Sequence, residues 1–290
     1  MRVAAIQMRV GVSRDENVAR ALHLVDEAAA RGARLIALPE YLTYIGPPSR
    51  FGDVAETIPG PTSRSLAAKA REHGVVIHCG SLVEPLASAA GDRPASSAMF
   101  SNTSYVVDPT GAVGAVYRKV HLFDVTVGDD VSESESTHIA PGDRLVVAES
   151  PDLVLGMSTC YDLRFPELYR ALALAGATVM LVPAAFAEAT GRAHWEVLLR
   201  ARAVENGAFV VAAAQHGHGA AWPMHGHSMI VDPWGTVLAS LPAGDGVIVA
   251  DIDPGEAERR RDQVPVLANR RPSIYARQVH RAHLAFCREM

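Results

Sequence analysis

The chain has 290 residues, a hydrophobic content of 49% and a formal net charge of −5. This length and apolar content allow one large buried core, and the negative charge argues against a general nucleic-acid binder. Nothing in the sequence indicates a long polar linker, so we expect a single domain over residues 1–290.

The N-terminus and the cysteines favour a cytoplasmic protein. Residues 1–10 (MRVAAIQMRV) are typical of a strand rather than of a charged head followed by a long apolar signal segment. No run reaches the roughly 18 apolar residues that a membrane span needs. The cysteines Cys79, Cys160 and Cys287 are odd in number, which does not fit a disulfide framework, so we expect reduced thiols.

Predicted helices and strands alternate along the chain. Ser13 and Glu16 form the pattern of a capping box, and apolar residues then recur at helical spacing as far as Gly32. The later pairs are a helix over 62–73 before a strand over 75–83, a helix over 165–175 before a strand over 178–184, and a helix over 193–205 before a strand over 209–214. This alternation predicts an α/β architecture with buried sheets.

Two predicted hairpins, over residues 105–117 and 229–241, resemble each other. Each has the sequence Asp-Pro-x-Gly at its turn, where proline presets the bend and glycine can adopt a positive φ. The repetition predicts two similar halves, each a sheet with helices on one face. Two such sheets would pack through their uncovered faces and give a four-layer α-β-β-α sandwich.

Glu40 follows the apolar run 35–38 and Pro39, so a carboxylate ends a predicted buried strand. A glutamate that is desolvated in this way has a raised pKa and could take a proton from a thiol and pass it to a leaving amine. The alternative interpretation is a strand-end glutamate paired with a surface arginine.

Lys119 is unusual because the chain has 27 lysines and arginines but only two lysines, Lys69 and Lys119. Arg118 lies directly beside it, so position 119 is predicted to need a compact ammonium that can donate to a developing oxyanion. The alternative is that a rare lysine has no special role, which is our interpretation of Lys69 in its predicted helix.

Cys160 lies between the apolar run 153–155 and a predicted helix start at Phe165-Pro166. A turn at the carboxyl end of a strand projects its side chains out of the sheet, and nearby helix N-terminal amides favour a thiolate. The turn therefore predicts a nucleophile, although an inert buried cysteine would also fit. Arg164 could bind a substrate carboxylate or neutralise Asp162.

Weaker candidates and rival sites come from other segments. Phe186, Thr190 and Tyr44 are candidates for the wall of a substrate pocket. A Cys-His dyad could use His121 or His194. The histidines between 216 and 227 form two H-x-H pairs that could bind a metal. The alternative is that this glycine-rich segment is a mobile loop at the entrance of the site.

The chain resembles the nitrilase superfamily of carbon–nitrogen hydrolases nearly end to end. The resemblance is carried by VAAIQM, LPEYLTY, YRKVHLFD, APGD, STCYDLRFPELYR, TGRAHWEVLLRARAVENGAFVVAAAQ, GHSMIVDPWGTVLA and RRPSIYA. It implies the four-layer fold, with Glu40 as general base, Lys119 as oxyanion stabiliser and Cys160 as nucleophile. A second family glutamate, six residues before the proline of the PGD motif, corresponds to Glu135, with Glu133 close by.

The resemblance also implies a mechanism without a metal or organic cofactor. Glu40 would deprotonate Cys160, Lys119 and the backbone N–H of Tyr161 would hold the oxyanion, and a thioester would form and be hydrolysed. Within the superfamily, the motifs are most similar to the branch of deaminated glutathione amidases. That branch implies release of 2-oxoglutarate and cysteinylglycine, in the role of metabolite repair.

One departure from that branch concerns the residues before Gly226-His227-Ser228. Members carry an arginine and an aromatic residue there, whereas this chain has His225 and no arginine. Another amide therefore stays open as the substrate, such as that of an ω-amidase or an N-carbamoyl amine hydrolase. A catalytically silent scaffold or binding protein is the alternative outside enzymes.

The C-terminal segment 255–290 is rich in arginine. Between Arg259 and Met290 there are eight arginines against Asp262 and Glu289. Together with the prolines and Tyr275, this composition favours packing across a partner subunit over binding to phosphate. We expect a homodimer or a higher homo-oligomer, and no nucleic-acid or membrane partner.

Overall fold

Two mixed β-sheets lie face to face in the computed structural model, which describes residues 1–86, 99–128, 131–150, 152–219 and 222–276. The first sheet has the order β17 (Gly246–Asp251), β1 (Arg2–Gln7), β2 (Leu35–Ala37), β3 (Val76–His78), β5 (Phe100–Val107) and β4 (Leu82–Pro85), and β6 (Val113–Arg118) pairs with β5. The second has the order β16 (Val237–Leu241), β15 (Ser228–Val231), β12 (Phe209–Ala214), β11 (Val179–Ala184), β10 (Val154–Met157) and β9 (Val147–Glu149).

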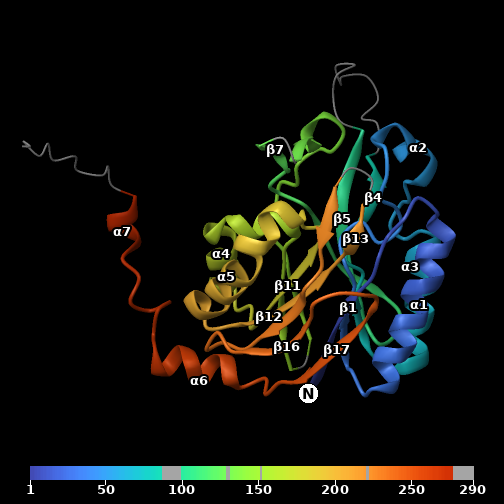
Figure 1. The fold of residues 1–290 in the computed structure, drawn as a ribbon. Coiled ribbons are helices and arrows are strands. Elements are labelled where there is room, and N and C mark those ends of the chain that lie inside the picture. Colours follow the sequence, from blue (N-terminus) through green and yellow to red (C-terminus); the bar gives the residue numbers. More distant parts are fainter. Residues whose placement is uncertain (87–98, 129–130, 151, 220–221, 277–290) are drawn as a thin grey trace, which may run out of the picture.

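Helices cover the outer face of each sheet. The helices α1 (Arg14–Ala30) and α3 (Pro61–His73) pack on the first sheet, and α4 (Pro166–Leu174) and α5 (Glu188–Asn206) pack on the second. Figure 1 shows the two helix layers on opposite sides of the paired sheets. This arrangement confirms the predicted four-layer α-β-β-α sandwich.

Alternation along the strands explains the layers. In β1, Ala4 and Ile6 face the core beneath α1 and α3, whereas Val3 and Ala5 face the second sheet. In β12, Val210 is likewise turned towards the helices of its own half. Because successive strand residues point to opposite faces, strands that are apolar throughout can form both a helix-facing and a sheet-facing core.

The two predicted hairpins are present as β5–β6 and β15–β16 and share their details. Gly111 and Gly235 have φ values of 80° and 87°. Asp108 and Asp232 each accept hydrogen bonds from two backbone amides of their turn. The register also shifts at equivalent places, between residues 106 and 107 and between residues 230 and 231. The repetition within the sequence therefore corresponds to a structural repeat.

Two details of the predicted helices were wrong. Ser13 precedes α1 but makes no capping hydrogen bond through its side chain. The helix α5 begins at Glu188, five residues before the predicted start, and therefore contains Thr190 and Gly191. Gly191 lies inside this helix and does not end it. A glycine is needed at this position because a Cβ there would collide with the His225 ring.

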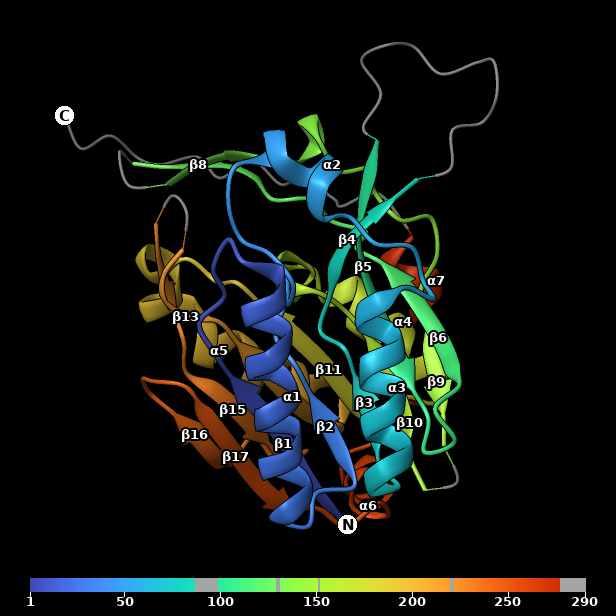
Figure 2. The same cartoon turned by 90° about the vertical axis from the view of Figure 1, so that its right-hand side faces the viewer.

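Short elements close one end of the sandwich, where the parallel strands of both sheets end. They are η1 (Pro48–Arg50), α2 (Phe51–Val54), the hairpin of β7 (Asp124–Val127) and β8 (Val131–Ser134), η2 (Glu135–Thr137), η3 (Cys160–Arg164), and the hairpin of β13 (His216–His218) and β14 (Pro223–His225). Figure 2 shows α2, β8 and β13 at this end, opposite the N-terminus. Binding sites in parallel sheets form at the carboxyl ends of the strands.

The chain after β17 leaves the layered body. It forms α6 (Glu256–Gln263) and then leads outward to α7 (Pro272–Tyr275), where Tyr275 is 63% exposed. The rest of the predicted tail, including Cys287, lies outside the described residues, so its place at a subunit interface stays a prediction. Within the described parts of the chain, no helix is long and apolar enough to cross a membrane.

Candidate active site

Glu40 lies in the turn after β2, where it is only 1% exposed. Its Oε1 accepts hydrogen bonds from Lys119 Nζ at 3.1 Å and Asn102 Nδ2 at 2.9 Å. Its Oε2 accepts one from the backbone N–H of Ala185 at 2.8 Å, and Gln215 donates to its backbone carbonyl at 2.7 Å. The alternative of a strand-end glutamate paired with a surface arginine is therefore wrong.

Lys119 directly follows β6 and is 2% exposed. Its ammonium also donates to Glu135 Oε2 over 2.8 Å, so that it bridges two carboxylates. Burial on its own would lower the pKa of Lys119, but the negative charges of Glu135 and Glu40 together raise it well above its ordinary value. The site therefore holds a fixed positive charge at neutral pH.

Glu135, at the start of η2, is held by several donors. Besides Lys119, it accepts the Tyr41 hydroxyl at 2.8 Å and the Phe123 N–H at 2.7 Å. Burial works against its charge, but the Lys119 ammonium and these hydrogen bonds hold the pKa of Glu135 below its usual value. Glu133, the other predicted possibility, accepts only the neighbouring Ser134 N–H and does not contact Lys119 among the described contacts.

Cys160 begins η3, three residues after the last residue of β10, and has a φ of 49°. A positive φ is unusual for a residue with a side chain and is typical of strained turns at functional sites. Burial raises the pKa of the Cys160 thiol well above its ordinary value, Glu40 raises it further, and Lys119 opposes both. The thiol is therefore neutral and needs a base, which Glu40 can supply.

Asp162 anchors the turn that carries Cys160. Its carboxylate accepts the Thr159 N–H at 2.8 Å, the Tyr117 hydroxyl at 2.6 Å and the His121 N–H at 3.0 Å. The His121 ring also lies 2.8 Å from this carboxylate and is stacked on Phe165. His121 thus has a structural position, and the geometry gives no support to a Cys-His dyad that uses it.

A cavity of about 320 Å³ opens onto Cys160, Glu40, Lys119 and Glu135. Its wall includes four of the predicted substrate-binding residues, which are Tyr44, Tyr161, Phe186 and Thr190. Further aromatic residues of the wall are Tyr41, Phe51, Phe123 and Trp222. A mostly apolar pocket with a few convergent polar groups is typical of a small-molecule site.

Arg164 lies behind this wall rather than in it. Its guanidinium stacks over Phe186 at 5.0 Å and Tyr161 at 5.8 Å, and Nη1 donates to His194 Nδ1 at 3.0 Å. It does not neutralise Asp162, whose oxygens accept other donors. His194 in turn contacts Arg164 and not Cys160 among the described hydrogen bonds, so the second dyad finds no support either.

Asn102 and Tyr41 are parts of the site that sequence reasoning missed. Asn102 donates to both glutamates, and Tyr41 lines the cavity and donates to Glu135. The signal for Asn102 was the polar run 101–104, which interrupts an otherwise apolar strand. Each of these four polar residues is at most 1% exposed. Polar residues in a buried strand need hydrogen-bond partners, so this run could have indicated that Asn102 contacts other polar groups of the site.

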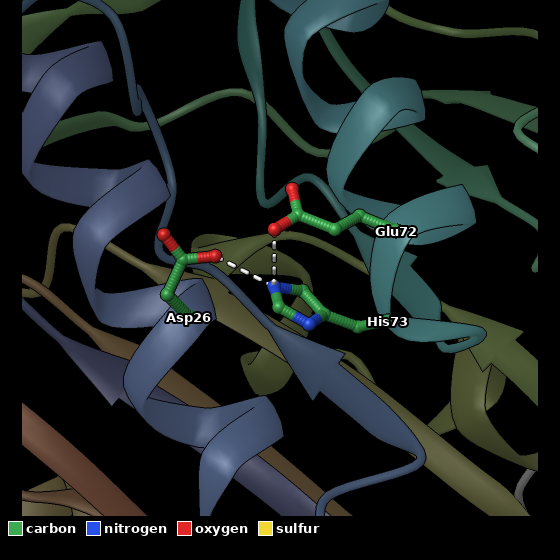
Figure 3. A group of neighbouring side chains, drawn as sticks. All are labelled: Asp26, Glu72 and His73. Atoms are coloured by element: carbon green, nitrogen blue, oxygen red, sulfur yellow. Dashed lines mark hydrogen bonds and ion pairs between the residues drawn. The ribbon is translucent and has the colours of Figure 1, made fainter.

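The described histidines between 216 and 227 are not gathered as metal ligands. His225 stacks on His227 with ring centroids 4.4 Å apart, and His216 pairs with Asp245 at 2.6 Å. The group of described side chains close enough to share an ion lies elsewhere, on α1 and α3. It consists of Asp26, Glu72 and His73 (Figure 3).

Lys69 already neutralises that group on α1 and α3. Its ammonium lies 2.7 Å from Asp26 and 3.0 Å from Glu72, and His73 lies 2.6 Å from Asp26. A cation at this position would compete with the lysine for both carboxylates. The cluster is therefore an ion-pair network between two surface helices, which also accounts for the second lysine of the chain.

Comparison with known proteins agrees with this geometry. The carbon–nitrogen hydrolase family model matches residues 2–262. The chain belongs to the carbon–nitrogen hydrolase family. Among curated proteins, the deaminated glutathione amidase of Synechocystis sp. (strain PCC 6803 / GT-S) is 40% identical over 92% of this hydrolase and 97% of that protein. The omega-amidase NIT2 of Homo sapiens is 35% identical over 95% and 96% of the two chains.

A solved structure is similar over nearly the whole chain. A variant of the amidase from Nesterenkonia sp. AN1 carries the acetamide moiety of fluoroacetamide, added covalently at its active site cysteine. It matches this hydrolase with a TM-score of 0.76 and 27% identity, over 95% of each chain. These comparisons confirm the resemblance to the nitrilase superfamily. This hydrolase is a cysteine-dependent amidase that acts on carbon–nitrogen bonds other than peptide bonds.

Proposed function

We propose that this hydrolase cleaves a small linear amide through a thioester on Cys160, with deaminated glutathione as the first candidate substrate. The observation that carries the proposal is the bridge from Lys119 to Glu40 and Glu135 at a cavity that opens onto Cys160. A thiol, a carboxylate that can act as a base, and a lysine ammonium lie around this one small volume.

The first half-reaction forms the thioester. As the Cys160 sulfur attacks the amide carbonyl, Glu40 takes the thiol proton, and the carbonyl oxygen becomes an oxyanion. The Lys119 ammonium and the Tyr161 N–H stabilise that oxyanion. The carbon–nitrogen bond then breaks, and the amine or ammonia leaves with the proton that Glu40 returns.

The second half-reaction releases the acid. Glu40 takes a proton from a water molecule as the water attacks the thioester carbonyl, and Lys119 again faces the oxyanion. Collapse expels the Cys160 sulfur, which regains its proton from Glu40. One carboxylate therefore alternates between base and acid, while Glu135 keeps Lys119 in place.

The substrate proposal rests on the names of the relatives. One relative is a deaminated glutathione amidase, which would correspond to release of 2-oxoglutarate and cysteinylglycine. Another is an omega-amidase, which makes a 2-oxo acid amide the second candidate. An N-carbamoyl amine stays a third possibility, and a silent scaffold is disfavoured because the acid, base and nucleophile types are all present.

The experiment is a substrate panel with a matched blank. Deaminated glutathione, 2-oxoglutaramate, an aliphatic amide and an N-carbamoyl amine are incubated with the wild type and with Cys160→Ala. Release of 2-oxoglutarate from deaminated glutathione, without matching ammonia, supports the proposal. Turnover that survives in Cys160→Ala contradicts the nucleophile, whereas Cys79→Ala serves as the control for a buried cysteine outside the cavity.

Two further proposals concern the cellular compartment and the oligomeric state of the enzyme. The free thiols of Cys79 and Cys160 suit a reducing compartment, so we place the enzyme in the cytoplasm. We also propose a homodimer or a higher homo-oligomer, because the segment around α7 leaves the body and exposes Ile274 and Tyr275. Light scattering of the full chain and of a chain ending at residue 254 would test the proposed oligomeric state.

A further inference from the structure

We propose that Asn102 is a positioning residue that keeps Glu40 and Glu135 ionised together and selects the oxygen of Glu40 that accepts the Cys160 proton. The inference rests on the proposed function, because it concerns the base of that reaction. Asn102 has no place in the sequence motifs that indicate the catalytic residues.

The side chain of Asn102 connects both glutamates. Its Nδ2 donates to Glu40 Oε1 at 2.9 Å and to Glu135 Oε1 at 3.3 Å. A side-chain amide has two N–H hydrogens, so each can serve one carboxylate. Its backbone carbonyl accepts the N–H of Lys119 at 2.9 Å. One residue therefore contacts both carboxylates and the backbone of Lys119.

The position of Asn102 is rigid. It is 0% exposed and lies on β5, which is hydrogen-bonded to β4 on one side and to β6 on the other. Val83 faces it in the register of β4. A side chain held on a central strand fixes distances better than one on a loop.

The charges of the site create the need for such a residue. Glu40 and Glu135 share the single ammonium of Lys119, so the buried group carries one excess negative charge. Two carboxylates close together disfavour double ionisation, and one of them takes up a proton unless donors stabilise the charge. Asn102 supplies two hydrogen bonds without adding a charge.

Glu40 depends on Asn102 more than Glu135 does. Glu135 also has the Tyr41 hydroxyl and the Phe123 N–H, whereas the other described donors to the Glu40 carboxylate are Lys119 and the Ala185 N–H. The titratable groups that act on this pair from the elements around it are Lys119, Tyr41 and Cys160, and Glu133 and His138 lie further along the cavity wall.

The hydrogen bonds also distinguish the two oxygens of Glu40. Lys119 and Asn102 both donate to Oε1, which uses the two lone pairs of that oxygen. Oε2 accepts only the Ala185 N–H among the described donors and keeps capacity for the proton of Cys160. Loss of Asn102 would free Oε1 to take a proton and would leave Glu40 without its defined orientation.

The experiment compares Asn102→Leu, which has a similar size but no donor, with Asn102→Asp, which has the same shape but adds a third carboxylate. Thr103→Val is the matched control, because Thr103 is the next residue of β5, is equally buried, and donates to Glu84 outside the site. Two pH profiles are measured for each protein, one for kcat/KM of amide hydrolysis and one for alkylation of Cys160 by iodoacetamide.

Alkylation reports on Glu40 without any turnover. The sulfur forms a bond to the methylene carbon, iodide leaves, and Glu40 takes the thiol proton. We expect the acid limb of both profiles to move about one to two pH units higher in Asn102→Leu and further in Asn102→Asp, since a hydrogen bond to a charged group has that magnitude. The profile of Thr103→Val should match the wild type, and KM should change little in Asn102→Leu.

An acid limb of folded Asn102→Leu within about 0.3 pH unit of the wild type overturns the inference. If Asn102→Leu does not fold, Asn102→Ser, which keeps one donor, takes its place. A smaller upward shift of the acid limb in Asn102→Ser supports the inference, and no shift overturns it. A wild type that hydrolyses no amide but shows the alkylation shift contradicts the proposed function alone. Amide hydrolysis with unshifted profiles contradicts only the role of Asn102.

Discussion

The ammonium of Lys119 lies 3.1 Å from Glu40 Oε1, although the two residues are 79 positions apart in the chain. The lysine directly follows β6 and the glutamate lies in the turn after β2, so the first sheet brings them together. This contact joins the fixed cation of the site to its candidate base, and it makes the identity of the cation open to a direct test.

Lys119→Arg should lower kcat by about 10²–10³-fold, the magnitude found when one oxyanion donor is removed. The larger planar guanidinium cannot occupy a position that is 2% exposed without moving one of the two carboxylates. Steady-state kinetics check this change. Lys69→Arg is the matched control, because that lysine lies on the surface of α3; activity of Lys119→Arg near that of the control would argue against a need for a compact ammonium.

Tyr41→Phe should reduce kcat by about tenfold and change KM little. The substitution removes one hydrogen bond to the ionised Glu135, worth about 1.5–3 kcal/mol, while Lys119 and the Phe123 N–H still hold that carboxylate. Kinetics at saturating substrate measure the effect. An unaltered kcat would show that the phenol hydroxyl serves only the packing of the cavity wall.

Glu133→Gln should raise kcat/KM for an anionic amide such as 2-oxoglutaramate by about three- to tenfold. Glu133, Glu40 and Glu135 line the cavity with Lys119 as their counter-charge, so an anionic substrate meets an excess of negative charge among the described wall residues. Neutral pentanamide should change less than twofold. The exposed Glu149→Gln serves as control, and equal responses of both amides would contradict a charge effect.

His78 should make the enzyme less stable in acid. Burial lowers the pKa of this side chain from 6.5 to about 3, and neither ring nitrogen has a described partner. The folded ring stays neutral, whereas the unfolded ring gains a proton below 6.5. Stability is therefore complete above pH 6.5 and falls as the pH drops towards 3, by at most about 1.4 kcal/mol per pH unit.

Urea unfolding of the wild type and of His78→Leu between pH 7 and pH 4 measures this loss. The free energy of unfolding should fall less steeply with decreasing pH in His78→Leu. His23→Gln, at an exposed position on α1, should keep the wild-type slope. Identical slopes for the wild type and His78→Leu would mean that His78 is not the group responsible.

The sequence predicted the fold because the signals for it are local. Apolar strands, helical spacing and the two Asp-Pro-x-Gly turns each depend on residues close together in the chain. The start of α5 was missed for the opposite reason. Thr190 and Gly191 are poor helix formers, and only the ring of His225, more than thirty positions later, explains the glycine there.

The residue types Glu40, Lys119 and Cys160 could be chosen from the sequence because each departs from its surroundings: a carboxylate after a buried strand, a rare lysine, and a thiol in a turn. Their partners could not. Asn102 and Tyr41 have no local feature that links them to Glu135, and the choice of Glu135 over Glu133 depends on which carboxylate points towards Lys119.

The sequence by itself determined the layered architecture and the chemical types at the site, because hydrophobic periodicity and turn chemistry act over a few residues. Only the tertiary structure decided which groups share protons and charges. Hydrogen bonds and charge interactions act over a few ångströms. Glu40, Asn102, Lys119 and Cys160 come within that range although they lie in three separate parts of the chain, near β2, in the β5–β6 hairpin and after β10.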